Sequence, residues 1–142
     1  VPDVTVLAQK DGPITLDRFK GKFVVLNFWA TWCGPCIREL PSLERLNTEL
    51  GGEKAQVVLI SQDRDGFKQT DRFLKKLKVN LPDNFIDERL KFSRAISVGS
   101  LPTTILIGPD GMELGRLVGS AEWDSPEALD LINWYIDKAG SS

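Results

Sequence analysis

The chain's two cysteines are separated by two residues, in the stretch Cys33-Gly34-Pro35-Cys36. This spacing suits thiol–disulfide exchange, because the second thiol can reach the sulfur of the first and release a substrate bound to it. We therefore predict that Cys33 attacks a disulfide and that Cys36 resolves the mixed disulfide. Trp32 precedes the pair and offers a flat, amphipathic contact surface beside the sulfur.

The surrounding sequence favours a reactive Cys33. Residues 23–29 are almost continuously apolar, which is typical of a strand buried on both faces. From residue 34 to about 50, apolar residues recur at steps of three and four, as on one face of a helix. Cys33 is thus predicted at a helix start, where backbone N–H groups and the helix dipole stabilise a thiolate. Pro35 fits the first turn of that helix.

The same pair has other interpretations. Two buried cysteines without chemistry are one, and a structural zinc site is another, although zinc normally takes about four ligands. A Cu(I) dithiolate site is a third, but the chain has no histidine and a single methionine, Met112, to assist it. We predict no metal site and no cofactor beyond the redox-active Cys33–Cys36 disulfide.

Composition limits the function classes further. With 42% hydrophobic and 27% charged residues, the 142-residue chain can build one soluble globular domain. A net charge of −2 argues against a broad electrostatic contact with nucleic acid. The absence of histidine excludes Ser-His-Asp and Cys-His nucleophiles. No segment approaches the roughly 18 consecutive apolar residues of a membrane span.

Apolar periodicity and turn residues place the remaining elements. We predict strands at residues 4–8, 14–16, 55–61, 103–107 and 112–118, and helices at 66–78, 88–96 and from 125 onward. Strands separated by helices imply parallel pairing, and a turn at 108–111 adds an antiparallel hairpin. The predicted fold class is α/β, a mixed central sheet with helices on both faces. We expect a single domain over residues 1–142, with a disordered tail at 140–142.

Two motifs resemble the thioredoxin superfamily. Residues 28–36, FWATWCGPC, are similar to its active-site stretch, and Leu101-Pro102-Thr103-Thr104 is similar to its cis-proline loop. The resemblance implies a thioredoxin-like fold with a cis Leu101–Pro102 bond opposite the cysteines. It implies that the loop keeps metal from the thiols and that the Leu101 backbone pairs with an extended substrate. A trans proline that opens a strand is the alternative. The implied substrate-binding residues are Trp32, Gly34, Pro35, Leu101 and Pro102.

Within the superfamily, the chain is more similar to the TlpA/ResA/DsbE-like thiol-disulfide oxidoreductases. Cys36 is followed by Ile-Arg-Glu-Leu-Pro, and Asn27 stands where ordinary thioredoxins have a buried aspartate. Residues 62–97 resemble the branch's central insertion, and the N-terminal strands are additions to the minimal fold. The resemblance implies that Glu39 is catalytic, tuning the cysteine pair and accepting a proton. An ordinary solvent-facing helix glutamate is the alternative for Glu39.

The predicted function is that of a thiol-disulfide oxidoreductase. The resemblance implies a reductase of specific protein disulfides, of the cytochrome c maturation or copper-site assembly type. It also implies a protein substrate with a cysteine pair, a membrane thiol-reductant protein as electron donor, no nucleic acid, and a monomer. We expect a periplasmic or extracytoplasmic location, with an export signal or membrane anchor before Val1. A cytoplasmic location is the alternative.

Three alternative functions stay open at this point: a general cytoplasmic thioredoxin, a thiol peroxidase and a Cu(I)-binding module. The chain lacks the motif expected of a thiol peroxidase, because residues 25–31 contain no proline. We interpret Trp123 and Trp134 as packing or half-exposed residues and not as a binding site. Asp63, Asp65 and Asp71 do not match a calcium loop.

Overall fold

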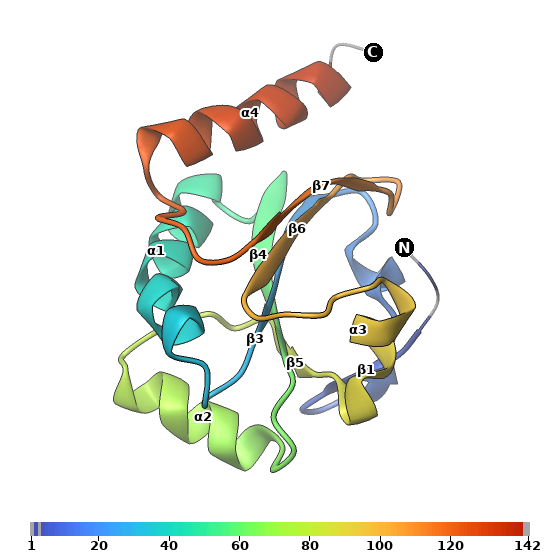
Figure 1. Cartoon of the computed structure of the whole chain (residues 1–142). Helices are drawn as coiled ribbons and strands as arrows, with labels where there is room; N and C mark the ends of the chain where they lie inside the picture. Colours follow the sequence, from blue (N-terminus) through green and yellow to red (C-terminus); the bar gives the residue numbers. More distant parts are fainter. Residues whose placement is uncertain (1, 3, 141–142) are drawn as a thin grey trace.

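A mixed β-sheet runs through the centre of the molecule (Figure 1). The structure is a computed structural model that describes residues 2 and 4–140. In these residues the strand order is β2-β1-β5-β4-β3-β6-β7. The strands are β1 (Val6–Ala8), β2 (Gly12–Ile14), β3 (Phe23–Trp29), β4 (Ala55–Ser61), β5 (Asn84–Ile86), β6 (Thr103–Ile107) and β7 (Glu113–Val118).

The central strand β3 pairs in parallel with β4 and antiparallel with β6. β5 continues the parallel part, while β7 and the hairpin of β1 and β2 add antiparallel strands at the two edges. All seven residues of β3 and of β4 are buried, as their apolar runs predict. The predicted thioredoxin-like α/β fold with a mixed sheet is confirmed.

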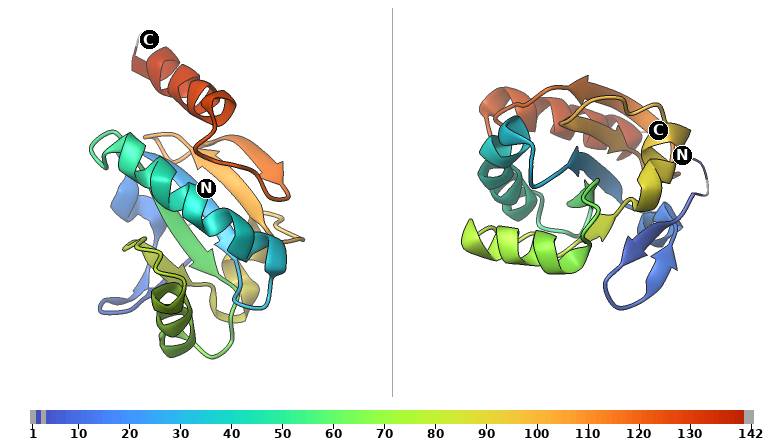
Figure 2. Two further views of the ribbon diagram at one scale, coloured as in Figure 1. Left: turned by 90° about the vertical axis from the view of Figure 1, so that its left-hand side faces the viewer. Right: turned by 60° about the horizontal axis from the view of Figure 1, so that its bottom comes forward.

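Helices cover both faces of the sheet (Figures 1 and 2). They are α1 (Gly34–Leu50), α2 (Phe67–Lys76), α3 (Lys91–Ala95) and α4 (Pro126–Gly140), with 3-10 turns η1 (Leu16–Phe19) and η2 (Glu88–Leu90). One core cluster joins α1, α2 and α4 to the face of β3 that carries Val25 and Trp29. The other joins α3 and η1 to the face that carries Leu26 and Phe28. The period of two along β3 therefore decides which side chains meet α1.

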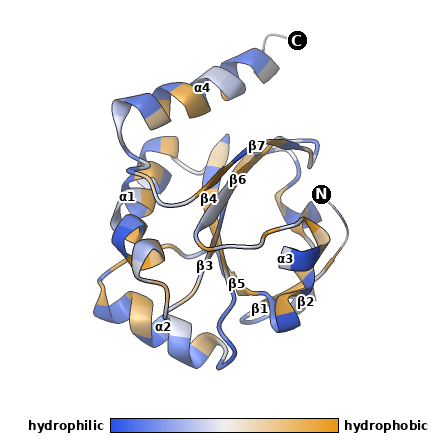
Figure 3. Cartoon of the chain, viewed as in Figure 1, coloured by the Kyte–Doolittle hydropathy of each residue, from blue (hydrophilic) through white to orange (hydrophobic). Residues whose placement is uncertain are grey.

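The first helix matches its prediction at both ends. It begins directly after Cys33 and ends at Leu50, where Gly51 adopts a left-handed conformation with φ of 75°. Its apolar residues alternate with hydrophilic ones, as Figure 3 shows for the length of α1. The buried residues of α1 are Cys36, Glu39, Leu40, Ser42, Leu43 and Leu46. A charged residue in this set is unexpected for a face that meets a core.

Three elements differ from the sequence predictions. The second strand lies at Gly12–Ile14 instead of 14–16, because Gly12 reaches a φ of +68° and Leu16 already begins a 3-10 turn. Strand β5 was not predicted, since three residues are too few to show a period. The helix predicted at 88–96 is interrupted, because Arg89 and Leu90 have φ of 56° and 58°.

The last helix extends further than the sequence indicated. Gly140, which the sequence placed in a disordered tail, is the final residue of α4. Residues 141–142 lie outside the described part of the chain.

Candidate active site

The cysteine pair lies where β3 gives way to α1. Residues 30–33 form a turn in which the Cys33 N–H donates to the Ala30 carbonyl at 3.1 Å. Cys33 is the N-cap of α1, and the Cys36 N–H donates to its sulfur at 3.3 Å. The two cysteines form a disulfide with their Cα atoms 5.3 Å apart. Cys33 keeps 7% of its surface exposed and Cys36 none, so a reaction partner meets Cys33 first.

The loop before β6 lies beside this turn. The Leu101–Pro102 peptide bond is cis, so the alternative of a trans proline is wrong. Thr103, the next residue, pairs with Phe28 near the end of β3, and Leu101 packs on the core cluster that contains both cysteines. The Pro102 carbonyl accepts from Gly119 N at 2.8 Å. Two segments far apart in sequence therefore meet at the disulfide.

Glu39 is a buried member of the site, and only 2% of it is exposed. Its Oε1 accepts from Asn27 Nδ2 at 2.7 Å, and its Oε2 accepts from Ala121 N and Trp123 Nε1, each at 3.0 Å. Burial raises the pKa of Glu39, and the donors Asn27, Ala121 and Trp123 oppose that rise in decreasing order. The interpretation of Glu39 as a solvent-facing residue is wrong.

Asn27 links Glu39 to the neighbouring strand. It lies on β3, on the face toward α1, and its Nδ2 donates to Thr104 Oγ1 at 2.9 Å as well as to Glu39. Its Oδ1 is buried and has no hydrogen-bond partner among the described residues. An unpartnered buried acceptor costs free energy, so a feature of this kind calls for an explanation in terms of function or strain.

Trp123 is a contributor that the sequence did not reveal. It is buried, as the packing interpretation requires, but its indole N–H also donates to Glu39. Its backbone N–H donates to Ser42 Oγ at 3.1 Å, and that hydroxyl donates to the Glu39 carbonyl at 2.7 Å. The only sequence signal is that a buried indole N–H needs an acceptor, which does not identify the acceptor.

Asp63 is another buried carboxylate near the cysteine turn, and it was assigned no role from the sequence. It is 4% exposed and follows β4 closely. Its carboxylate accepts from the backbone and hydroxyl of Thr31, in the turn that leads to Cys33. In contrast, Trp134 is exposed on α4, packs on Tyr135 and lies outside the site.

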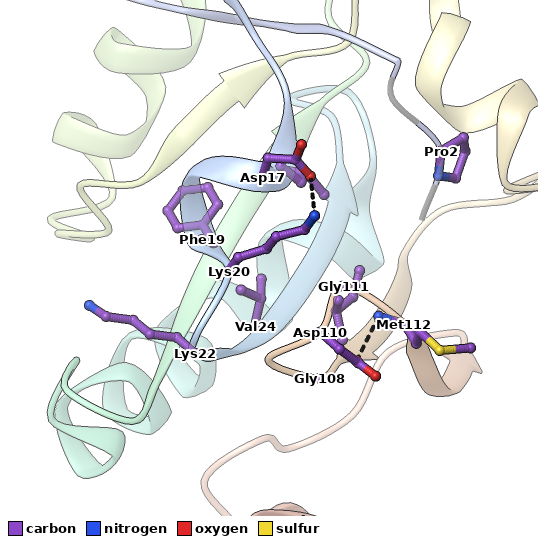
Figure 4. A pocket seen from close by; sticks show the side chains of 12 residues that line it. Pro2, Asp17, Phe19, Lys20, Lys22, Val24, Gly108, Asp110, Gly111 and Met112 are labelled. Atoms are coloured by element: carbon purple, nitrogen blue, oxygen red, sulfur yellow. Dashed lines mark hydrogen bonds and ion pairs between the residues drawn. The ribbon is translucent and has the colours of Figure 1, made fainter.

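Two hollows lie apart from the disulfide. One, of about 120 Å³, lies between η1, the beginning of β3 and the turn before β7, so it is at the opposite end of β3 from Cys33 (Figure 4). There Lys20 pairs with Asp17 at 3.4 Å. The other, of about 460 Å³, is largely apolar and lies between α4 and strands β6 and β7. Neither is lined by a cysteine.

The described residues hold neither a metal-binding cluster nor a membrane-spanning helix. Among residues 2 and 4–140, no group of three or more His, Cys, Asp or Glu side chains gathers as a metal site would require. No helix in this range is long and apolar enough to cross a membrane.

Comparison with known proteins identifies the family of this chain. The pattern of the Redoxin family matches residues 1–132. The chain belongs to the Redoxin family. This Redoxin protein is 32% identical over 118 residues to thiol-disulfide oxidoreductase ResA of Bacillus cereus, covering 83% of the chain and 67% of that protein. It is 33% identical over 116 residues to ResA of Bacillus subtilis, covering 81% and 64%.

A solved structure supports the same assignment. The Redoxin protein superposes on a crystal structure described as a putative thiol:disulfide interchange protein DsbE of Chlorobium tepidum with a TM-score of 0.80. The identity is 28%, and the match covers 95% of this chain and 93% of the other. With its Cys33–Cys36 disulfide, this Redoxin protein is a thiol-disulfide oxidoreductase of the ResA/DsbE-like branch.

The structure brings the residues singled out from the sequence to one end of the sheet. Trp32, Cys33 and Cys36 lie in the turn and the first turn of α1, and Leu101 and Pro102 lie in the adjoining loop. Gly34 and Pro35 are exposed at the start of α1. Glu39 lies behind the disulfide, one helical turn beyond Cys36.

Proposed function

We propose that this oxidoreductase reduces disulfide bonds of other proteins, with Cys33 as nucleophile and Cys36 as resolving thiol. The observation that carries this assignment is the unequal setting of the two sulfurs. Cys33 is the more accessible of the two, with 7% of its surface exposed against none for Cys36, and it lies at the N-terminus of α1 with the Cys36 N–H aimed at its sulfur at 3.3 Å. The Cys36 N–H and the dipole of α1 stabilise a thiolate at Cys33 in the reduced protein.

The reaction balances as two thiol–disulfide exchanges. The Cys33 thiolate attacks one sulfur of the substrate disulfide, forms a mixed disulfide and releases the first substrate thiolate. Cys36 then loses its proton and attacks the Cys33 sulfur, which releases the second substrate thiolate. The products are the Cys33–Cys36 disulfide, as seen here, and a substrate dithiol that has gained two electrons and two protons.

We assign to Glu39 the acceptance of the Cys36 proton. The two residues lie one turn apart on α1 and therefore on the same side of the helix. Burial raises the pKa of Glu39 above that of an ordinary glutamate, and a more basic carboxylate is a better proton acceptor. An ionised Glu39 accepts from all three of its donors, whereas a protonated one needs an acceptor.

Asn27 is able to supply that acceptor. Its Nδ2 now donates to Glu39 Oε1, and its Oδ1 has no partner among the described residues. Reversal of the side-chain amide would turn Oδ1 toward Glu39 and allow a protonated carboxyl to donate to it. The unpartnered oxygen of Asn27 thus fits a carboxyl group that changes its protonation state.

The substrate surface is assigned to the exposed rim around Cys33. Trp32 is 69% exposed, and Gly34 and Pro35 are also open to solvent. In the described part of the chain, the backbone of Leu101 makes no hydrogen bond. An extended substrate segment can therefore pair with Leu101 and bring its disulfide to Cys33.

We further propose that the protein works as a reductant outside the cytoplasm on specific protein partners, with a membrane thiol-reductant protein as electron donor. The relatives named ResA and the DsbE-like neighbour support this placement. The cytochrome c maturation and copper-site assembly types remain the substrate classes that the resemblance implies. A single-domain monomer is the form in which we expect it to act.

The reduction potential of the cysteine pair tests the direction of the reaction. We expect a value near about −270 mV or lower, as in reducing thioredoxins. A value of about −120 to −180 mV would make the protein an oxidant or isomerase and overturn the direction. Equilibration with defined dithiothreitol ratios, followed by thiol alkylation and mass analysis, gives the potential.

Turnover of a disulfide protein such as insulin with dithiothreitol tests the assigned roles. Cys33→Ser should remove all acceleration, because no mixed disulfide can form. Cys36→Ser should instead accumulate a mixed disulfide through Cys33, since attack persists and resolution is lost. Equal turnover by wild type and Cys33→Ser would contradict the assignment.

A further inference from the structure

The turn that carries Trp32 and Cys33 is held by Asp63, a carboxylate in the segment that follows β4. Asp63 Oδ1 accepts from Thr31 Oγ1 at 2.6 Å, and the Thr31 backbone N–H lies 3.2 and 3.0 Å from Oδ1 and Oδ2. Oδ2 also accepts from Ser61 Oγ at 2.6 Å, while Asp63 N donates back to Ser61 Oγ at 2.9 Å. The buried carboxylate thus joins the end of β4 to the residue just before Trp32.

A second residue, from helix α2, also binds Thr31. Gln69, on α2, donates from Nε2 to Thr31 Oγ1 at 3.0 Å. The Gln62 N–H donates to the Trp29 carbonyl at 2.9 Å and so extends the β3–β4 pairing to the edge of the turn. The hydroxyl and backbone of Thr31 are therefore bound by Asp63, which follows β4, and by Gln69 on α2.

We propose that Asp63 is a positioning residue for Cys33, acting through Thr31. The inference rests on the proposed function, in which Cys33 must meet a substrate sulfur in line. Attack of this kind is sensitive to small displacements, since a shift of about 1 Å in a reacting group can cost roughly a hundredfold in rate. The Asp63 clamp, defined as Asp63 with Thr31, Ser61 and Gln69, fixes the turn before the N-cap of α1.

A carboxylate suits this role because both of its oxygens accept. Asparagine can reproduce much of the arrangement: its Oδ1 accepts from Thr31, and its Nδ2 can donate to the Ser61 hydroxyl. Alanine leaves the Thr31 N–H and two hydroxyls without their acceptor. Asp63→Asn is therefore the conservative variant and Asp63→Ala the disruptive one.

Asp87 provides a matched control elsewhere in the fold. It is 2% exposed, and its carboxylate accepts from Phe92 N at 2.9 Å, Ser93 N at 2.8 Å and Ser93 Oγ at 2.6 Å. Asp87 thus holds the start of α3 with a similar set of donors, on the sheet face away from α1. Asp87→Ala removes carboxylate bonds that hold neither Thr31 nor Cys33. It keeps the backbone bond from the Asp87 N–H to the Ser61 carbonyl and the bond from Gln62 Nε2 to Ser93 Oγ, so the Asp63 clamp stays in place.

The experiment measures two properties of the reduced proteins at a temperature where all variants are folded. One is kcat and KM for insulin reduction, and the other is the rate of Cys33 alkylation by iodoacetamide as a function of pH. We expect Asp63→Ala to lower kcat/KM by about tenfold to a hundredfold and to alter the pH profile of alkylation. We expect Asp63→Asn to keep most of the wild-type activity and profile. Asp87→Ala should lose stability but keep both properties.

Thr31→Val keeps the experiment decisive if Asp63→Ala does not fold. It retains the backbone N–H to Asp63 and removes only the hydroxyl, so we expect a smaller loss of the same kind. Unchanged kinetics in these variants, or an equal loss in Asp87→Ala, would overturn the inference. Absence of insulin reduction by the wild type would instead overturn the proposed function, and the alkylation profiles would still decide the role of Asp63.

Discussion

Two buried carboxylates, Glu39 and Asp63, lie in the surroundings of the cysteine turn, and their hydrogen-bond partners differ. Glu39 is on α1 behind Cys36 and accepts from three N–H groups, two of them in the segment between β7 and α4. Asp63 follows β4 and accepts from two hydroxyls and one backbone N–H. Among the described residues, the two groups have no hydrogen-bond partner in common.

The difference indicates a division of labour. The Glu39 environment contains an unpartnered acceptor, Asn27 Oδ1, and burial raises the pKa of Glu39, so this site is suited to gain and lose a proton. Asp63 is tied to the backbone of the turn itself and to the adjoining strand, so it is suited to hold geometry. In our proposal, Glu39 serves the resolving thiol and Asp63 positions the attacking thiol.

The largest expected effect concerns Glu39. Glu39→Gln should lower insulin turnover by about a hundredfold near neutral pH, because general-base assistance is typically worth at least this much. Wild-type turnover should rise with pH as the raised-pKa carboxyl ionises, and the variant should lose this rise. The rate of the resolution step, measured by stopped flow at pH values from about 5 to 9, gives both results.

Glu49→Gln is the matched control for this prediction. Glu49 is an exposed glutamate on the same helix, so its replacement should leave the profile unchanged. If Asp63→Asn abolished the pH dependence while Glu39→Gln kept it, the roles of the two carboxylates would be exchanged.

A smaller effect is expected at Trp32, which lies between the clamped Thr31 and Cys33. Trp32→Ala should raise KM for insulin about tenfold, since exposed tryptophans are frequent anchors of protein contacts. Exchange with dithiothreitol should change little. Trp134→Ala, at an exposed tryptophan on α4 away from the disulfide, should alter neither.

Trp32→Ala also shows how the Asp63 clamp acts. If Asp63→Ala raises KM as Trp32→Ala does, the clamp acts by holding the contact surface. If Asp63→Ala lowers kcat instead, the clamp acts on the Cys33 sulfur. An unchanged KM in Trp32→Ala would remove Trp32 from the substrate surface.

Much of the site was accessible from sequence because its signals are local. The cysteine pair, the strand before it and the helix after it lie within residues 23–50, and each has a period or a motif of its own. The cis-proline loop was located by resemblance. The parallel pairing of β3 with β4 agrees with the expectation for strands separated by helices, because crossovers constrain that pairing.

The remainder depends on contacts that no local pattern encodes. Asn27, Glu39 and Trp123 come from β3, α1 and the segment between β7 and α4, and their hydrogen bonds span 12 and 84 positions. Asp63 matches no sequence motif, and its partner Thr31 lies 32 positions away. Strand β5 has only three residues, and the break in the predicted helix depends on positive φ angles at Arg89 and Leu90.

The last prediction uses folding stability to separate the two carboxylates. Because burial raises the folded-state pKa of Glu39, the folded protein binds its proton more tightly than the unfolded chain. This contribution to stability is fully present below the ordinary glutamate pKa of 4.5 and is lost as pH rises through the raised value. The loss amounts to about 1.4 kcal/mol for each pKa unit of the rise.

Urea unfolding between pH values of about 4.5 and 8 should therefore show this decline in wild type and a flatter curve in Glu39→Gln. Asp83 also has a pKa raised by burial, so Asp83→Asn measures the second contribution separately. Glu113 and Asp124 pair with arginines that lower their pKa values, which puts their effect below this range. A decline that persists in Glu39→Gln but vanishes in Asp63→Asn would assign the proton exchange to Asp63, and the division of labour would fail.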